Sequence, residues 1–226
     1  LGLIDADGNV PQPTRIDDLM LPPVAYGVKV ISIGMFLRRT HGEAPVGAVA
    51  WRGPMLHRTV QQFLTDVYFG DLDVLLLDMP PGTGDIAISV GQLLPHAEVL
   101  VVTTPQPAAS DVAVRSGLVA RQTGQRVTGV VENMSAMTLP DGTSLELFGA
   151  GGGAEVADAL STAAEPVRLL GSIPLSTRLR ADGDVGTPVV VADPDDPAAV
   201  AITALAEILA AAQRGLAGRS LPLRPE

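Results

Sequence analysis

A carboxylate that directly follows a short apolar run is the most chemically informative feature of this sequence. Residues 74–77 are Val-Leu-Leu-Leu, a pattern that predicts a strand buried on both faces of a parallel sheet. Asp78 comes next, at the strand end where open α/β sheets bind their ligands, and the Pro/Gly-rich loop 80–84 follows it. A carboxylate in this position can hold Mg²⁺ against nucleotide phosphates. The alternative is a buried strand that ends in an ordinary turn with a helix-capping Asp.

The composition narrows the classes of protein that the sequence allows. Of the 226 residues, 46% are hydrophobic and 18% charged, which is typical of a globular protein. There is no cysteine, which excludes disulfides, thiolate catalysis and a metal centre ligated by cysteines of this chain. A net charge of −10 with a single lysine, Lys29, argues against a nucleic-acid partner. No apolar run approaches the ~20 residues that span a bilayer and the chain opens without a leader-like segment, so we expect no membrane partner and a cytoplasmic location.

Strands and helices are predicted to alternate along the chain. The predicted strands are residues 1–4, 27–34, 73–78, 98–104, 126–134 and 167–173, with a short extended piece at 189–191. Helices are predicted from about residue 54 to 67 and at 86–94, 110–123, 154–164 and 197–214, with a loop at 8–23. This order predicts an α/β fold, a doubly wound and mostly parallel sheet with helices on both faces. We expect one domain, residues 1–215, and a tail at 216–226.

A phosphate-binding loop is missing from the sequence. Nucleotide-binding sheets of this kind usually carry a glycine-rich loop after the first strand, and no GxxxxGK[ST] pattern occurs here. The glycine run Gly149–Gly153 lacks the lysine and is a poor substitute. No GxGxxG turn follows a predicted strand, which argues against a dinucleotide-binding dehydrogenase. We therefore expect that the sequence begins one strand and one helix too late.

Several motifs together resemble one protein family. They include Trp-Arg-Gly-Pro-Met-Leu at 51–56, Asp-Met-Pro-Pro-Gly-Thr-Gly-Asp at 78–85, Val-Glu-Asn-Met-Ser at 131–135 and Gly-Ser-Ile-Pro-Leu at 171–175. The sequence resembles the Mrp/ApbC iron–sulfur cluster carriers, P-loop ATPases of the deviant-Walker-A MinD/ParA class, over nearly its whole length. The resemblance implies a homodimeric ATPase that delivers clusters to client apoproteins. Without a phosphate loop, the 226-residue chain itself is expected to be inactive as an ATPase.

The resemblance also assigns carboxylates to metal binding and hydrolysis. Asp78 matches the family's Walker B carboxylate, which holds Mg²⁺. Asp5 and Asp7 match aspartates that help hold Mg²⁺, partly through water, and orient the attacking water. Carboxylate oxygens suit Mg²⁺ chemically, although Asp5 and Asp7 could equally cap a turn.

A second set of residues is implied to contact the nucleotide. Gly82, Gly84 and Asp85 match the switch loop that senses the γ-phosphate. Asn133 matches the residue that hydrogen-bonds adenine, and Pro174 begins the loop beside the base. An amide suits the adenine edge because it both donates and accepts hydrogen bonds, although Asn133 could instead satisfy backbone groups at a strand end.

One segment departs from the family pattern. Family members with an established cluster site carry a Cys-x-x-Cys pair soon after the Asn-Met-Ser strand end, whereas residues 136–143 here contain no cysteine. Two subunits could therefore not hold a bridging [4Fe–4S] cluster in the usual way. Asp141-Gly142 instead predicts a tight hairpin turn. The alternative function is a nucleotide-gated interaction or scaffold protein, although the retained Asp5, Asp7 and Asp78 favour continued use of ATP.

Overall fold

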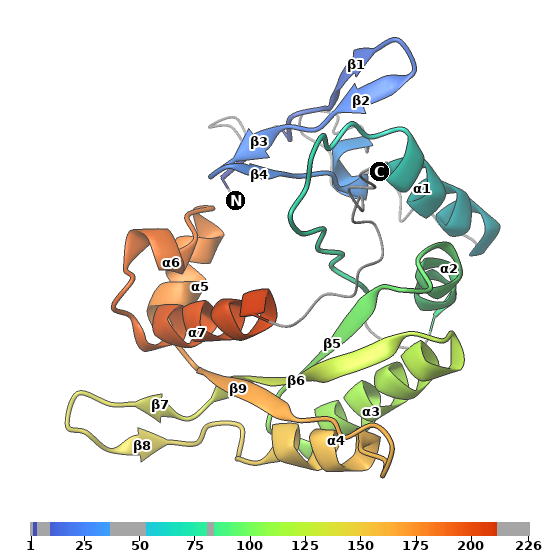
Figure 1. Cartoon of the computed structure of the whole chain (residues 1–226). Helices are drawn as coiled ribbons and strands as arrows, with labels where there is room; N and C mark the ends of the chain where they lie inside the picture. The colour runs from blue at the N-terminus through green and yellow to red at the C-terminus, as the bar shows by residue number, and fades with distance from the viewer. Residues whose placement is uncertain (1, 4–9, 37–52, 81–83, 212–226) are drawn as a thin grey trace, which may run out of the picture.

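A three-stranded parallel sheet forms the centre of the protein. The computed structural model describes residues 2–3, 10–36, 53–80 and 84–211 (Figure 1). The strands β5 (Glu98–Thr103), β6 (Arg126–Ser135) and β9 (Leu169–Pro174) lie in the order β5-β6-β9, and both neighbouring pairs are parallel. Helices connect these strands along the chain, so the predicted α/β fold with a parallel sheet is confirmed.

Helices cover this sheet. The helices α3 (Pro107–Gln122) and α4 (Gly152–Leu160) pack against β5 and β6, and α7 (Pro197–Ala211) lies against β9 from the other side (Figure 1). Val130 of β6 and Val156 and Leu160 of α4 are completely buried in the shared core. Each such side chain contributes about 1.5–3 kcal/mol to folding, so this layer is the main source of stability.

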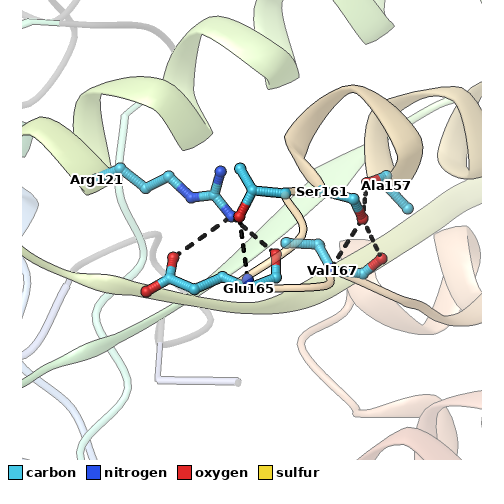
Figure 2. Close-up of polar contacts among 6 residues, drawn as sticks. Arg121, Ala157, Ser161, Glu165 and Val167 are labelled. Atoms are coloured by element: carbon cyan, nitrogen blue, oxygen red, sulfur yellow. Dashed lines mark hydrogen bonds and ion pairs between the residues drawn. The ribbon is translucent and has the colours of Figure 1, made fainter.

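A side-chain network fixes the carboxyl-terminal end of α4 (Figure 2). The Ser161 hydroxyl lies 2.9 Å from the carbonyl oxygen of Ala157 and 3.0 Å from that of Val167, and it accepts a hydrogen bond from the Val167 N–H at 2.9 Å. Nearby, the Arg121 guanidinium of α3 lies 3.7 Å from the Glu165 carboxylate. These contacts join α4 to the segment that enters β9.

The amino-terminal part forms two small antiparallel hairpins. They are built from β1 (Thr14–Ile16), β2 (Leu19–Leu21), β3 (Val24–Ala25) and β4 (Val28–Lys29), followed by the 3-10 helix η1 (Ile33–Phe36). Tyr26 and Gly27 both have positive φ, as the two-residue turn of the second hairpin requires. Met20 forms a bridge with Val67, just beyond helix α1 (Gly53–Thr65), which itself packs against α2 (Asp85–Leu93).

The hairpin predicted at Asp141-Gly142 is confirmed. β7 (Met137–Thr138) and β8 (Ser144–Leu145) pair around a turn in which Gly142 has a φ of 82°. The Asp141 carboxylate accepts hydrogen bonds from the hydroxyl and the backbone N–H of Thr143, and these lower the pKa of Asp141 below its usual value. Two short helices, α5 (Thr177–Asp184) and α6 (Val189–Ala192), precede α7.

The strand predicted at residues 73–78 is wrong for the structure described. The segment belongs to no strand, and the four residues of its apolar run are 36–86% exposed. A strand needs a neighbour that pairs with its backbone N–H and C=O groups. No described strand pairs with this segment, and β5 pairs only with β6.

Other differences are local. The predicted loop at 8–23 contains the β1–β2 hairpin, and the predicted strand at 27–34 shrinks to β4 and then turns into η1. The predicted extended piece at 189–191 is helix α6, which follows Pro188. Of the predicted strand at 1–4, only residues 2 and 3 are described, and they belong to no strand. Within the described ranges, no helix is long and apolar enough to cross a membrane.

Candidate nucleotide-binding site

Two of the residues expected to bind nucleotide lie together at the carboxyl edge of the sheet. Because β6 and β9 are parallel neighbours, their carboxyl ends meet at the same edge. The register pairs Asn133 with Ile173 and Ser135 with Pro174, and the N–H of Leu175 donates to the Ser135 carbonyl at 3.0 Å. Asn133 and Pro174 are therefore held side by side on adjacent strands.

The Asn133 side chain is oriented by a local hydrogen bond. Its Oδ1 accepts from the Met134 backbone N–H at 2.8 Å, so the capping role considered from the sequence is present. Met134 has a φ of 57° and falls in a register shift between Asn133 and Ser135, which makes it a bulge. The Oδ1 keeps a second lone pair and the amide nitrogen keeps two donors. This amide can still pair with a purine edge.

A buried glutamate next to Asn133 was not anticipated from the sequence. Glu132 is only 5% exposed. Its Oε2 accepts a hydrogen bond from the Gly153 N–H at 2.8 Å, and its Oε1 lies 3.4 Å from the Ser172 hydroxyl, which donates to it. The sequence did contain one signal, a carboxylate placed directly after two valines of a predicted strand. A charged group in such a position is buried, and a buried charge needs hydrogen-bond partners.

The glycine run before α4 has a packing role. Gly152 lies so close to the end of β5 that an added Cβ would be 2.7 Å from the Pro105 carbonyl oxygen and 2.8 Å from that of Thr104. A Cβ on Gly153 would be 2.7 Å from the Cβ of Glu132. Because the Gly153 N–H already binds Glu132, this helix start is occupied by the protein's own carboxylate. Its occupation agrees with the expectation that the run is a poor phosphate loop.

The remaining predicted site residues are not brought together. Asp78 is exposed on a segment that belongs to no strand, and Gly84 and Asp85 are exposed at the start of α2, with Gly84 as its N-cap. Asp85 lies in the first turn of this helix, where a negative charge is favourable. Asp5, Asp7 and Gly82 lie outside the described residues. Within the described part of the chain, no cluster of three or more metal-ligating side chains occurs.

The parallel sheet with its connecting helices has the α/β fold of the P-loop NTPases, and solved structures agree. A nucleotide-binding protein from Archaeoglobus fulgidus, solved in complex with ADP, matches 77% of this chain and 64% of its own, with 29% identity and a TM-score of 0.58. The cell division ATPase MinD from Pyrococcus furiosus matches 70% of this chain and 58% of its own, with 24% identity and a TM-score of 0.50, and so supports the fold alone.

The family follows from the sequence comparisons. The model for the ParA family, described as the NUBPL iron-transfer P-loop NTPases, matches residues 2–210, and the chain belongs to this family. A curated relative from Mycobacterium tuberculosis strain H37Rv, an iron-sulfur cluster carrier protein, is 55% identical over 100% of this chain. Another from Deinococcus radiodurans is 39% identical over 93% of it. The chain spans about 60% of the length of these relatives.

Proposed function

We propose that the protein is a nucleotide-dependent iron–sulfur cluster carrier that binds and hydrolyses ATP and delivers clusters to apoproteins. The family and the names of its relatives support this proposal. The structural observation that carries the nucleotide part is the position of Asn133 and Pro174, near one another at the carboxyl ends of the adjacent parallel strands β6 and β9. A homodimer, client apoproteins and a cytoplasmic location belong to the same proposal.

Within this proposal, the predicted site residues have separate roles in binding Mg²⁺, positioning water and sensing the γ-phosphate. Asp78 and Asp5 would hold Mg²⁺, whose charge offsets that of the phosphates. Asp7 would position the attacking water, and Gly82, Gly84 and Asp85 would respond to the γ-phosphate. The phosphates themselves need a phosphate loop, which these 226 residues do not contain. The edge site described here would then supply the contacts to the base.

The residues of this chain do not fit a cluster. Iron–sulfur clusters are held by cysteine thiolates, and the chain has none. The segment where family members carry the Cys-x-x-Cys pair is the β7–β8 hairpin, with Thr138, Asp141, Thr143 and Ser144 as its polar residues. We therefore derive no step through a cluster bound to this chain. The hairpin favours the second candidate function, a nucleotide-gated interaction protein.

Anaerobic reconstitution distinguishes the two candidate functions. The intact gene product is incubated with ferrous iron and sulfide under reducing conditions and then desalted, and its iron and acid-labile sulfide are measured. Iron and sulfide retained at a fixed ratio to protein would support the carrier function. The cluster would then be held by ligands other than cysteines of these 226 residues, because they contain none. Loss of both on desalting, with ATP binding intact, would support the interaction protein.

The Asn133→Asp substitution tests the contact to the base. Asp keeps the oxygen that accepts from the Met134 N–H but loses the amide donors. We expect ATP binding to weaken about tenfold, the value of one or two lost hydrogen bonds, and GTP binding to weaken less. Isothermal titration of both nucleotides measures this selectivity. An equal change for ATP and GTP would show that Asn133 does not read the base.

A further inference from the structure

Glu132 has no part in the proposed chemistry, yet its position is unusual. Its carboxyl group is buried at the carboxyl edge of the sheet, directly before Asn133. Burying a charged group is costly unless hydrogen bonds compensate. Here the compensation comes from two different elements, the Gly153 N–H at the start of α4 and the Ser172 hydroxyl of β9. One side chain therefore connects three elements beside the base-binding edge.

These contacts lie next to the residues expected to bind adenine. Glu132 pairs in register with Ser172, and the next pair along the two strands is Asn133 with Ile173, followed by Pro174. The bond to Gly153 also closes the base of the excursion between β6 and α4 that contains the β7–β8 hairpin. The separation and the orientation of the two strand ends thus depend on the same carboxylate.

The backbone beyond Glu132 needs such support. Met134 has a left-handed φ of 57°, a conformation that a side-chain-bearing residue keeps only where its surroundings fix it. The other end of α4 is held separately by Ser161, so the position of the helix as a whole does not depend on Glu132. What depends on Glu132 is the local geometry at the strand ends.

We propose that Glu132 is the positioning residue of the base site: its bonds to Gly153 and Ser172 hold the ends of β6 and β9 so that Asn133 and Pro174 keep a fixed spacing. The inference rests on the proposed function only in taking the ligand to be an adenine nucleotide. Glu132 itself does not touch the nucleotide and acts through Asn133.

Hydrogen exchange tests the positioning role without any nucleotide. In Glu132→Ala, we expect the amide hydrogens of Met134 and Gly153 to exchange about tenfold faster, because both lose the support of the carboxylate. Glu132→Gln keeps the oxygen that accepts from Gly153 and should restore most of the protection at Met134. Glu155→Ala, at an exposed glutamate in the first turn of the same helix, is the matched control and should leave both unchanged.

A milder variant covers the case in which Glu132→Ala does not fold. Ser172→Ala removes only the 3.4 Å hydrogen bond from the Ser172 hydroxyl to Glu132 and leaves the bond from Gly153 in place. We expect the amide hydrogen of Met134 to exchange about threefold faster in this variant. Faster exchange at Gly153 with unchanged exchange at Met134 in Glu132→Ala would overturn the inference, because Glu132 would then only cap α4. If Glu132→Ala does not fold, unchanged exchange at Met134 in Ser172→Ala would overturn it.

Nucleotide titration separates this inference from the proposed function. If Glu132 acts through Asn133, Glu132→Ala should reduce the preference for ATP over GTP several-fold in the otherwise unchanged protein. In the Asn133→Asp background it should cause no further loss, since the two residues act on one contact. Additive losses would contradict action through Asn133. If the intact gene product binds no ATP, with or without these substitutions, the proposed function fails, and hydrogen exchange alone decides the role of Glu132.

Discussion

Gly152→Ala is expected to destabilise the protein by about 3 kcal/mol, because the new methyl group would meet two backbone carbonyl oxygens at 2.7 and 2.8 Å. A flexible side chain could move away, but the oxygens of Thr104 and Pro105 belong to the chain that leaves β5. For a domain of this size, the loss corresponds to a melting temperature lower by about 6–12 °C. Thermal and urea unfolding followed by circular dichroism measure it.

A second helical glycine provides the control for this substitution. A Cβ added at Gly183 in α5 would meet nothing within 4 Å. Because alanine favours the helix more than glycine does, Gly183→Ala should be neutral or stabilise the protein by up to about 1 kcal/mol. If the two variants unfold at the same temperature, the close approach of α4 to the end of β5 does not limit stability.

The same close approach gives the glycine run a packing role that the sequence did not predict. A run such as Gly149–Gly153 is compatible with a loop around phosphate and with tight packing of a helix against strand ends. Two hydrogen bonds show that the run serves packing. The Ser110 hydroxyl donates to the Gly152 carbonyl at 3.3 Å, and the Gly153 N–H donates to the Glu132 carboxylate. Both partners are distant in sequence, so local pattern could not reveal them.

The strands that were predicted well contain their own signals. Each of these strands contains consecutive apolar residues, Val99–Val102 in β5, Val130–Val131 in β6 and Leu169–Leu170 in β9, and the three strands pair with one another, so the local pattern and the pairing agree. The run at 74–77 has the same pattern but lacks a described neighbour, and pattern alone cannot supply one. The β1–β2 hairpin was missed because its turn at Asp17-Asp18, with Asp17 at a φ of 52°, resembles an ordinary polar loop.

The candidate site was predictable only in part. Asn133 and Pro174 were identified through family resemblance, and the strand register then placed them together. Glu132 carried only a weak signal, a charge within an apolar strand, because its meaning depends on Gly153 and Ser172 in other elements. The roles of all the predicted site residues remain predictions, and Asp5, Asp7 and Gly82 lie outside the described residues.

Asp78→Asn is expected to lower ATP turnover by the intact gene product at least about 100-fold. The amide is the same size as the carboxylate but lacks the charge that would hold Mg²⁺ and help offset the charge of the transferred phosphate. Because Asp78 is exposed, the free energy of unfolding should change by no more than about 0.5 kcal/mol. Turnover is measured by phosphate release, and stability by urea unfolding of the same preparations.

Asp71→Asn is the control that makes this test decisive. Asp71 is also exposed and lies shortly before the same apolar run, so its substitution removes an equal charge from the same surface. Equal turnover in the two variants would mean that Asp78 is a surface carboxylate, as its exposure in the present structure alone would suggest. A selective loss in Asp78→Asn would support the role of its charge in holding Mg²⁺ beside the phosphates.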